Sequence, residues 1–287
     1  MATVVPSGMA MRAEQLLKWA RLPVWWVTHD RRPGVVILMY HCVGGGTSLD
    51  IDMPVDLLAG QLAYLRRRYR IVSLDDLRSI TDRAEPDDNQ LILTFDDGHE
   101  GIYTHLFPLL RRYRIPVTVY VPTAYVEEQR PFDWGGYRRL PEADRPRPMT
   151  WAQIRELMAS GLVSIGAHTH SHADLSQASP EQIQHELETS DALMDLRLGT
   201  RPRHFAYPNG RTSPAAGRLV AGAYETAVVI GSARNAHGAI DLHALRRVPV
   251  SAREGLWFFR MKLPALDAHT SPGFSPASPA TPGKGGA

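Results

Sequence analysis

Segments with strand character alternate with segments of helical character along most of this chain, and this alternation constrains its fold more than any other feature. The strand-like runs are rich in β-branched and aromatic residues, and they cover residues 35–41, 69–74, 91–97, 116–122, 162–169, 203–208, 225–231 and 244–250. The helix-like segments cover residues 54–69, 75–80, 101–114, 150–160, 179–199 and 213–223. Such repetition predicts a parallel α/β fold, and seven or eight strands favour a (β/α) barrel over an open sheet.

The predicted domain covers residues 34–263. Residues 1–33 are interpreted as an appendage, in which the tryptophan-rich segment 16–27 either packs on the domain or rests on a membrane surface or partner. Residues 264–287 are rich in Pro, Gly and Ser, and we expect them to be disordered. Within the domain, residues 123–148 are expected to form a long loop or insertion.

Composition excludes several classes of protein. The 32 Lys and Arg balance 30 Asp and Glu, and the net charge of +2 gives no electrostatic case for a nucleic-acid partner. One cysteine, Cys42, excludes an intrachain disulfide. We find no membrane span and no secretory signal, so we expect a cytoplasmic protein, for which residues 16–27 are a candidate contact to the inner membrane face if they do not pack on the domain. Oligomeric state cannot be read from the sequence.

Polar residues follow four of the predicted strands at their carboxyl ends. His41 ends the first strand, Asp96 and Asp97 end the third, His168 ends the fifth, and "YPNG" (207–210) ends the sixth. In parallel α/β folds these ends gather on one face, where sites form. The sequence therefore predicts one functional site at the mouth of the barrel.

Three histidines within five residues, His168, His170 and His172, indicate a metal site. An extended chain would direct all three to one face, whereas a helix would bring only His168 and His172 together. Imidazole suits zinc, and also cobalt, nickel and iron. One aspartate with two of these histidines would leave open positions, as catalytic metals require.

Adjacent carboxylates at the end of a buried strand need compensation, because burying an unpaired charge is costly. A metal would offset the repulsion between Asp96 and Asp97. One aspartate could then ligate the ion while the other takes a proton from a metal-bound water.

The segments "TFDDG", "HTHSH" and "FAYPNG", in this order, resemble the polysaccharide deacetylases with a NodB-homology domain (carbohydrate esterase family 4). "ILMYHCV" and "ALRRVPV" are similar to the bacterial branch with poly-N-acetylglucosamine deacetylases, so the resemblance covers about residues 35–250. It implies a distorted (β/α) barrel and a hydrolase that removes acetyl groups from an N-acetylated carbohydrate, such as an exopolysaccharide, with a divalent metal, most simply zinc.

The resemblance also implies roles for individual residues. By position, Asp96 is the general base, and Asp97, His168 and His172 are the metal ligands, while His170 falls at a variable position. In the bacterial branch the catalytic acid lies near the N-terminus, which here is His41.

The third motif implies the remaining site residues and contains the departures from the family. The backbone N–H of Asn209 matches the oxyanion donor, although an aromatic residue is common there, and Tyr207 is a candidate to border the sugar, as are Trp134 and Tyr137. The family arginine that holds the catalytic aspartate is replaced by Ala206. The C-terminal Leu-x-His motif is also absent, and we interpret His243 as a surface residue.

Other functions remain open at this point. A glycosidase needs two carboxylates about 5–9.5 Å apart on opposite sides of a sugar, which adjacent aspartates fit poorly. Another metal-dependent amidohydrolase, a non-haem iron oxygenase and a non-catalytic deacetylase-like domain that only binds glycan are the further alternatives. Metal content, acetate release and oxygen consumption would separate them.

Overall fold

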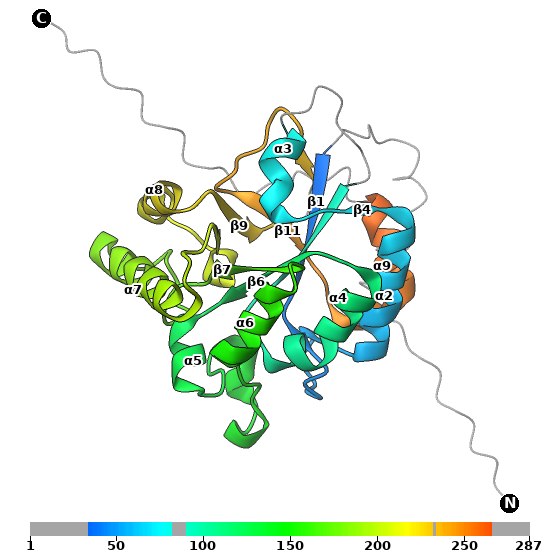
Figure 1. Cartoon of the computed structure of the whole chain (residues 1–287), viewed down its shortest axis with the longest axis horizontal. Helices are drawn as coiled ribbons and strands as arrows, with labels where there is room; N and C mark the ends of the chain where they lie inside the picture. Colours follow the sequence, from blue (N-terminus) through cyan, green and yellow to red (C-terminus); the bar gives the residue numbers. More distant parts are fainter. Residues whose placement is uncertain (1–33, 82–89, 232–233, 266–287) are drawn as a thin grey trace, which may run out of the picture.

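The computed structural model describes residues 34–81, 90–231 and 234–265. Its centre is a closed barrel of parallel strands surrounded by helices (Figure 1). The barrel strands are β1 (Gly34–Tyr40), β5 (Gln90–Phe95), β6 (Val117–Val121), β7 (Val163–Ala167), β8 (His204–Ala206), β9 (Thr226–Ile230) and β11 (Leu245–Pro249). The predicted (β/α) barrel is thus confirmed, with seven strands in the ring.

The ring closes because β1 pairs in parallel with both β5 and β11. Ile37 lies opposite Ile92 on one side and Arg247 on the other. The predicted strand 69–74 is only the short β4 (Arg70–Ile71), which pairs with the first two residues of β5. Three further short strands, β2 (Cys42–Val43), β3 (Asp52–Met53) and β10 (Asn235–Ala236), lie outside the ring.

The helices that cover the barrel are α2 (Val55–Arg68), α3 (Leu77–Thr81), α4 (Phe107–Tyr113), α5 (Thr123–Glu128), α6 (Trp151–Ala159), α7 (Pro180–Leu198), α8 (Pro214–Ala223) and α9 (Gly255–Ala265). Capping boxes begin α6 and α7, at Thr150 and Ser179, as their sequences predict. Pro108 is tolerated because it lies in the first turn of α4, directly after a π-helical turn (Ile102–Leu106).

Burial on both faces explains why the strands read as continuous apolar runs. Every residue of β1, β5 and β6 is buried, since helices cover the outside of the barrel and side chains fill the inside. One charged side chain, Arg247 on β11, is completely buried within this apolar environment. A fully buried guanidinium requires a partner.

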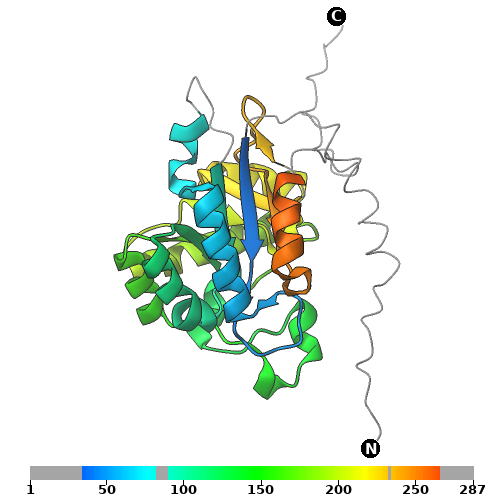
Figure 2. The same ribbon diagram turned by 90° about the vertical axis from the view of Figure 1, so that its right-hand side faces the viewer.

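Residues 123–148, expected to form a long loop or insertion, are an insertion between β6 and α6 that contains helical structure. It begins with α5 and contains two 3₁₀ turns, Gly135–Arg139 and Glu142–Asp144. In Figure 2, where β1 points downward, the insertion and the loop that follows β1 lie together at the carboxyl end of the barrel.

Two of the expectations on domain organisation lie outside the described residues. These are the appendage 1–33, with its segment 16–27, and nearly all of the tail 264–287. Residues 264 and 265 belong instead to α9, which the sequence analysis did not predict because its apolar residues show no clear period. Among the described helices, none combines the length and apolar character needed to cross a membrane.

Candidate active site

The polar residues predicted at the strand ends converge on one cavity of about 190 Å³. It is lined by His41, Asp96, Asp97, His168, His172 and Asn209, together with Met39, Ile51, Trp134, Gly135, Gly136, Tyr137, Gly210 and Ile230. These residues come from the ends of β1, β5, β7, β8 and β9, from the loop between β2 and β3, and from the insertion. The structure therefore brings together all the predicted site residues except Tyr207.

Asp96 is bound by the buried Arg247, which the sequence analysis had not considered. Arg247 donates from Nη1 to Oδ1 (2.5 Å) and from Nη2 to Oδ2 (2.7 Å) of Asp96, a two-pronged ion pair. Burial tends to raise the pKa of Asp96, but the charge and hydrogen bonds of Arg247 outweigh it and lower the pKa to about 2. Asp96 is thus held ionised and in one orientation.

The absence of an arginine at position 206 is therefore compensated from another strand. Arg247 reaches Asp96 from β11, the neighbour of β1 in the ring, and its Nη1 also donates to Thr94 (3.2 Å). The sequence signal for this contact was an arginine within the strand-like segment "ALRRVPV". The alternation of side chains along that segment could not assign the arginine to the barrel interior. Ala206 contributes its carbonyl oxygen, which accepts a hydrogen bond from His168 Nδ1 at 2.8 Å.

Asp97 lies in a cluster with His168 and His172. Its Oδ1 is 3.6 Å from Nε2 of each histidine, beyond hydrogen-bonding distance. Left-handed backbone conformations at Asp97 (φ 69°), Thr169 (φ 63°) and His172 (φ 59°) turn the chain sharply. The segment 168–172 is therefore neither extended nor helical, and the two histidines meet through these turns instead.

This cluster fits a divalent metal ion. One carboxylate and two imidazoles offer ligand atoms that all lie within 4.8 Å of one another. Two ligand atoms each about 2.1 Å from a tetrahedral ion are separated by about 3.4 Å, close to the spacing seen here. Burial lowers the pKa of both histidines, which favours the neutral, metal-binding form. His170 lies outside the cluster and bonds Thr123 through Nδ1 (2.9 Å).

His41 stands on the side of Asp96 that faces the cavity. Its Nε2 is 4.0 Å from Asp96 Oδ2, and its Nδ1 is buried without a partner in the described part of the chain. Burial lowers the pKa of His41 to about 4, against the opposing charge of Asp96. His41 is thus neutral at rest, and its Nε2 lies near the Asp96 carboxylate but beyond hydrogen-bonding distance.

The insertion supplies two aromatic side chains to the cluster. Tyr137 is buried and donates a hydrogen bond to Oδ2 of Asp97 at 2.9 Å, while Cys42 Sγ lies 3.1 Å from the same hydroxyl. Trp134 stacks on His172 with ring centroids 4.0 Å apart and planes 12° from parallel. Both residues thus contact members of the candidate metal-binding cluster, in addition to lining the cavity.

The remaining predicted residues differ in their access to the cavity. Asn209 lines it, with a left-handed backbone (φ 57°) in the turn after β8. Tyr207 is only 1% exposed and packs edge-on against Phe205, outside the residues that line the cavity. Packing against the core accounts for Tyr207. His243 bonds the carbonyl of Tyr224, away from the cavity.

Comparisons with known proteins identify the family of this chain. A family model for polysaccharide deacetylases matches residues 83–227. The Bacillus subtilis (strain 168) protein YxkH, assigned to the polysaccharide deacetylases, is 25% identical over 232 residues, which cover 78% of this chain and 75% of that protein. The poly-β-1,6-N-acetyl-D-glucosamine N-deacetylase of Escherichia coli (strain K12) is 34% identical over 145 residues, 48% of this chain but only 21% of that protein.

A solved structure supports the same assignment. IcaB from Ammonifex degensii superposes with a TM-score of 0.65 at 25% identity, covering 84% of this chain and 100% of that one. The enzyme class predicted from the sequence is thereby confirmed at the level of the family. Since the family model covers half of the chain and the relatives extend the match over most of the barrel, this chain belongs to the polysaccharide deacetylase family.

Proposed function

We propose that this protein is a metal-dependent hydrolase that removes acetyl groups from N-acetylglucosamine units of a polysaccharide. The observation that carries the proposal is the division of labour between two adjacent aspartates. Asp96 is paired with Arg247 and adjoins His41, whereas Asp97 faces His168 and His172. One carboxylate is thus available for proton transfer and the other for a metal ion.

Asp97, His168 and His172 would hold the ion. When bound, a divalent metal supplies a Lewis acid that polarises the acetyl carbonyl and makes water more acidic. Because Arg247 lowers the pKa of Asp96 to about 2, this carboxylate is ionised near neutral pH. It would accept the proton of the attacking water. The backbone N–H of Asn209, at the edge of the cavity, would donate to the developing oxyanion.

His41 completes the proton path in this proposal. Because its pKa is lowered, it rests neutral and becomes an acid only after receiving a proton. Asp96 Oδ2 lies 4.0 Å from Nε2 of His41. The proton taken from water would pass to His41 and then to the departing amine, which yields acetate and a glucosamine unit.

The substrate class is inferred from the relatives. The E. coli relative is named for poly-β-1,6-N-acetyl-D-glucosamine, and the 145 matched residues span about a fifth of its length. The cavity, at about 190 Å³, suits an acetamido group and part of one sugar. A single acetylated unit of a longer carbohydrate is therefore the proposed substrate at the reacting position.

Acetate release from N-acetylglucosamine oligomers tests the proposal. Protein loaded with zinc, cobalt, nickel or iron should release acetate from β-1,6-linked or chitin-type oligomers, and the same protein treated with a chelator should not. A folded, metal-loaded protein that releases no acetate from either series would contradict it. That result would favour the alternative of a domain that binds glycan without cutting it.

A further inference from the structure

Cys42, the single cysteine of the chain, begins β2 directly after His41 and is completely buried. Its side chain belongs to an apolar cluster with four residues of the insertion, Ala124, Tyr125, Phe132 and Tyr137. Burial raises the pKa of the thiol well above its usual value, so the thiol keeps its hydrogen near neutral pH. Cys42 is therefore a neutral thiol that can donate one hydrogen bond.

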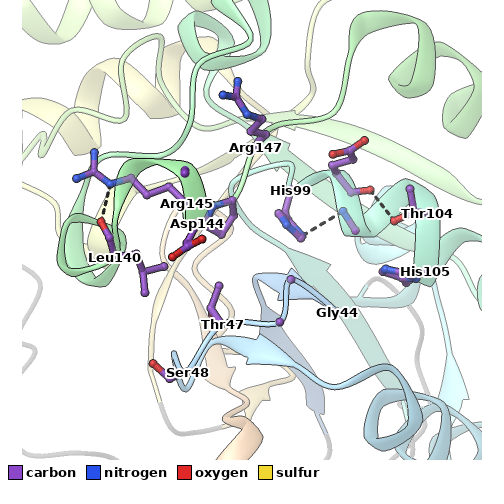
Figure 3. Close-up of a pocket in the computed structure, with 16 residues that line it drawn as sticks. Gly44, Thr47, Ser48, His99, Thr104, His105, Leu140, Asp144, Arg145 and Arg147 are labelled. Carbon is purple, nitrogen blue, oxygen red and sulfur yellow. Dashed lines mark hydrogen bonds between the residues drawn. The ribbon is translucent and has the colours of Figure 1, made fainter.

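The thiol lines neither of the two spaces that border its segment. His41, which precedes it, lines the catalytic cavity, and Gly44–Ser48, which follow it, line a neighbouring hollow of about 750 Å³ (Figure 3). A buried thiol that keeps its hydrogen is not a nucleophile, because the reactive form is the exposed thiolate. Any function of Cys42 therefore depends on the groups that its sulfur contacts inside the protein.

The polar group that Cys42 contacts is the hydroxyl of Tyr137, whose oxygen lies 3.1 Å from Sγ. The same hydroxyl donates its one hydrogen to Oδ2 of Asp97, at 2.9 Å. Because that hydrogen is used, the thiol is the donor in the contact with Tyr137 and the hydroxyl oxygen is the acceptor. Cys42, Tyr137 and Asp97 thus form a chain of two hydrogen bonds that ends on a candidate metal ligand.

The thiol strengthens the second bond of this chain. A hydroxyl that accepts a hydrogen bond is a better donor, because successive hydrogen bonds polarise one another where the dielectric constant is low. Cys42, Tyr137 and Asp97 are all buried, so water does not dilute this effect. The sulfur also occupies the space beside the hydroxyl, which keeps the Tyr137 ring from moving away from Asp97.

The chain gives the two oxygens of Asp97 different environments. Oδ2 receives the hydrogen of Tyr137, whereas Oδ1 is the oxygen that lies 3.6 Å from Nε2 of both His168 and His172. A carboxylate held through one oxygen presents the other in a fixed direction. Groups that orient metal ligands in this way typically change metal affinity about 10- to 100-fold.

Packing alone would be served equally well by an apolar side chain of similar volume, such as valine. Such a side chain would leave the Tyr137 oxygen without a donor among the residues that the structure describes. The comparison of cysteine with valine at position 42 therefore isolates the hydrogen bond from the volume of the side chain.

We propose that Cys42 is a positioning residue of the metal site, whose thiol holds and polarises the Tyr137 hydroxyl so that Asp97 binds a divalent ion more tightly. The inference rests on the proposed function, in which Asp97 is a metal ligand. It predicts that loss of the thiol weakens metal binding although every group that would contact the ion is retained.

Replacement of the thiol tests the proposal through metal affinity. Cys42→Val and Cys42→Ala should each weaken zinc affinity about threefold, below the effect of about tenfold or more for a direct partner of a ligand. Cys42→Ser keeps a donor and should restore most of the affinity. Competition with a metal-binding dye, in the absence of substrate, gives the affinities, and circular dichroism confirms folding. Two apolar variants keep the test informative if one of them fails to fold.

A double-mutant cycle separates the hydrogen-bond chain from packing. In a Tyr137→Phe background the oxygen that accepts from Cys42 is gone, so Cys42→Val should cause no further loss of affinity. Tyr125→Phe removes a different hydroxyl of the same cluster, one that donates to Asp133, and is the matched control background. There Cys42→Val should retain its full effect.

The outcomes separate failure of this inference from failure of the proposed function. Zinc affinity unchanged by both apolar substitutions, or an equal loss in the Tyr137→Phe background, would overturn the role of Cys42 even if the wild-type protein releases acetate. A loss that requires the Tyr137 hydroxyl would support it even if no acetate is released. A wild-type protein that binds no zinc would refute both, because Asp97 would then not be a metal ligand.

Discussion

The candidate active site has two parts: the Asp96 half, with Arg247, and the Asp97 half, with Tyr137 and the two histidines. The two parts stabilise a buried carboxyl group in different ways. Asp96 has a partner within the chain, the fully buried Arg247, and its pKa is lowered to about 2. Among the described residues, Asp97 has only the hydroxyl of Tyr137 and two neutral histidines beyond hydrogen-bonding distance. Burial and the charge of Asp96 raise the pKa of Asp97 to about 8 in the metal-free protein.

The difference shows that the protein itself balances the charge of the Asp96 half, whereas the Asp97 half lacks a cation. The Asp96 half is a satisfied ion pair whose geometry is fixed when the barrel closes, because β11 and β5 both flank β1. In the Asp97 half, no cation among the described residues pairs with the carboxyl group, so it keeps its proton, and a divalent metal ion would supply the missing positive charge. Changes in the two halves should therefore have different consequences.

The largest expected effect separates the two aspartates by activity and metal content. Asp96→Asn should lower the rate of acetate release about 10²- to 10⁴-fold, the usual contribution of general-base catalysis, while metal binding is retained. Asp97→Asn should lose activity and bound metal together. Metal analysis of both purified variants checks this, with circular dichroism to confirm folding. Loss of metal from Asp96→Asn as complete as from Asp97→Asn would refute the division of roles.

The next effect is on stability. Arg247→Met should lower the free energy of unfolding by about 3–5 kcal/mol, because it leaves Asp96 buried and unpaired. Arg246→Met is the matched control on the same strand, since its side chain is only half-buried. Urea unfolding of both variants measures the difference, and equal stabilities would mean that the ion pair does not hold Asp96 as described.

Tyr137 tests how much the insertion contributes to the Asp97 half. Tyr137→Phe removes the hydrogen bond to Asp97 Oδ2 and should weaken metal affinity about tenfold, the lower end of effects measured for residues that orient metal ligands. Competition with a metal-binding dye gives the affinity directly. Tyr125→Phe, in the same aromatic cluster, is the control, and an equal loss there would indicate a general effect of packing.

Much of this architecture could be predicted from sequence because it rests on local patterns. Strand and helix alternation identified the barrel, and the carboxyl ends of strands identified His41, Asp96, Asp97 and His168 as neighbours. The motif resemblance then distinguished His172 from His170. Each of these inferences uses residues that are close in sequence or equivalent by position.

What the sequence did not reveal depends on contacts between distant segments. Arg247 meets Asp96 across 151 positions, and Tyr137 meets Asp97 across 40. Both are polar contacts made when loops and strands close on each other, and no periodicity predicts them. The turns that join His168 to His172 depend on left-handed residues that are not glycine, so turn propensities do not signal them either.

The smallest effect concerns pH and bears on the Asp97 half alone. In the metal-free protein Asp97 keeps its proton up to about pH 8, whereas in the unfolded chain an aspartate loses it near pH 3.9. Between these values the folded state binds more protons than the unfolded state, so rising pH destabilises it. Buried histidines give the opposite slope below about pH 6.5, where unfolded histidine becomes protonated.

The interval from pH 7 to pH 8 therefore isolates Asp97. Across it, the free energy of unfolding of the metal-free protein should fall by about 1 kcal/mol, and Asp97→Asn should abolish the fall. Saturating metal should also abolish the fall, or make the free energy of unfolding rise with pH. The ion binds the deprotonated carboxylate, so metal affinity increases as Asp97 loses its proton. Urea titrations at these two pH values, with chelator or with metal, measure all three cases. A metal-free protein whose stability is flat across the interval would mean that the Asp97 half is already compensated within the chain, as the Asp96 half is.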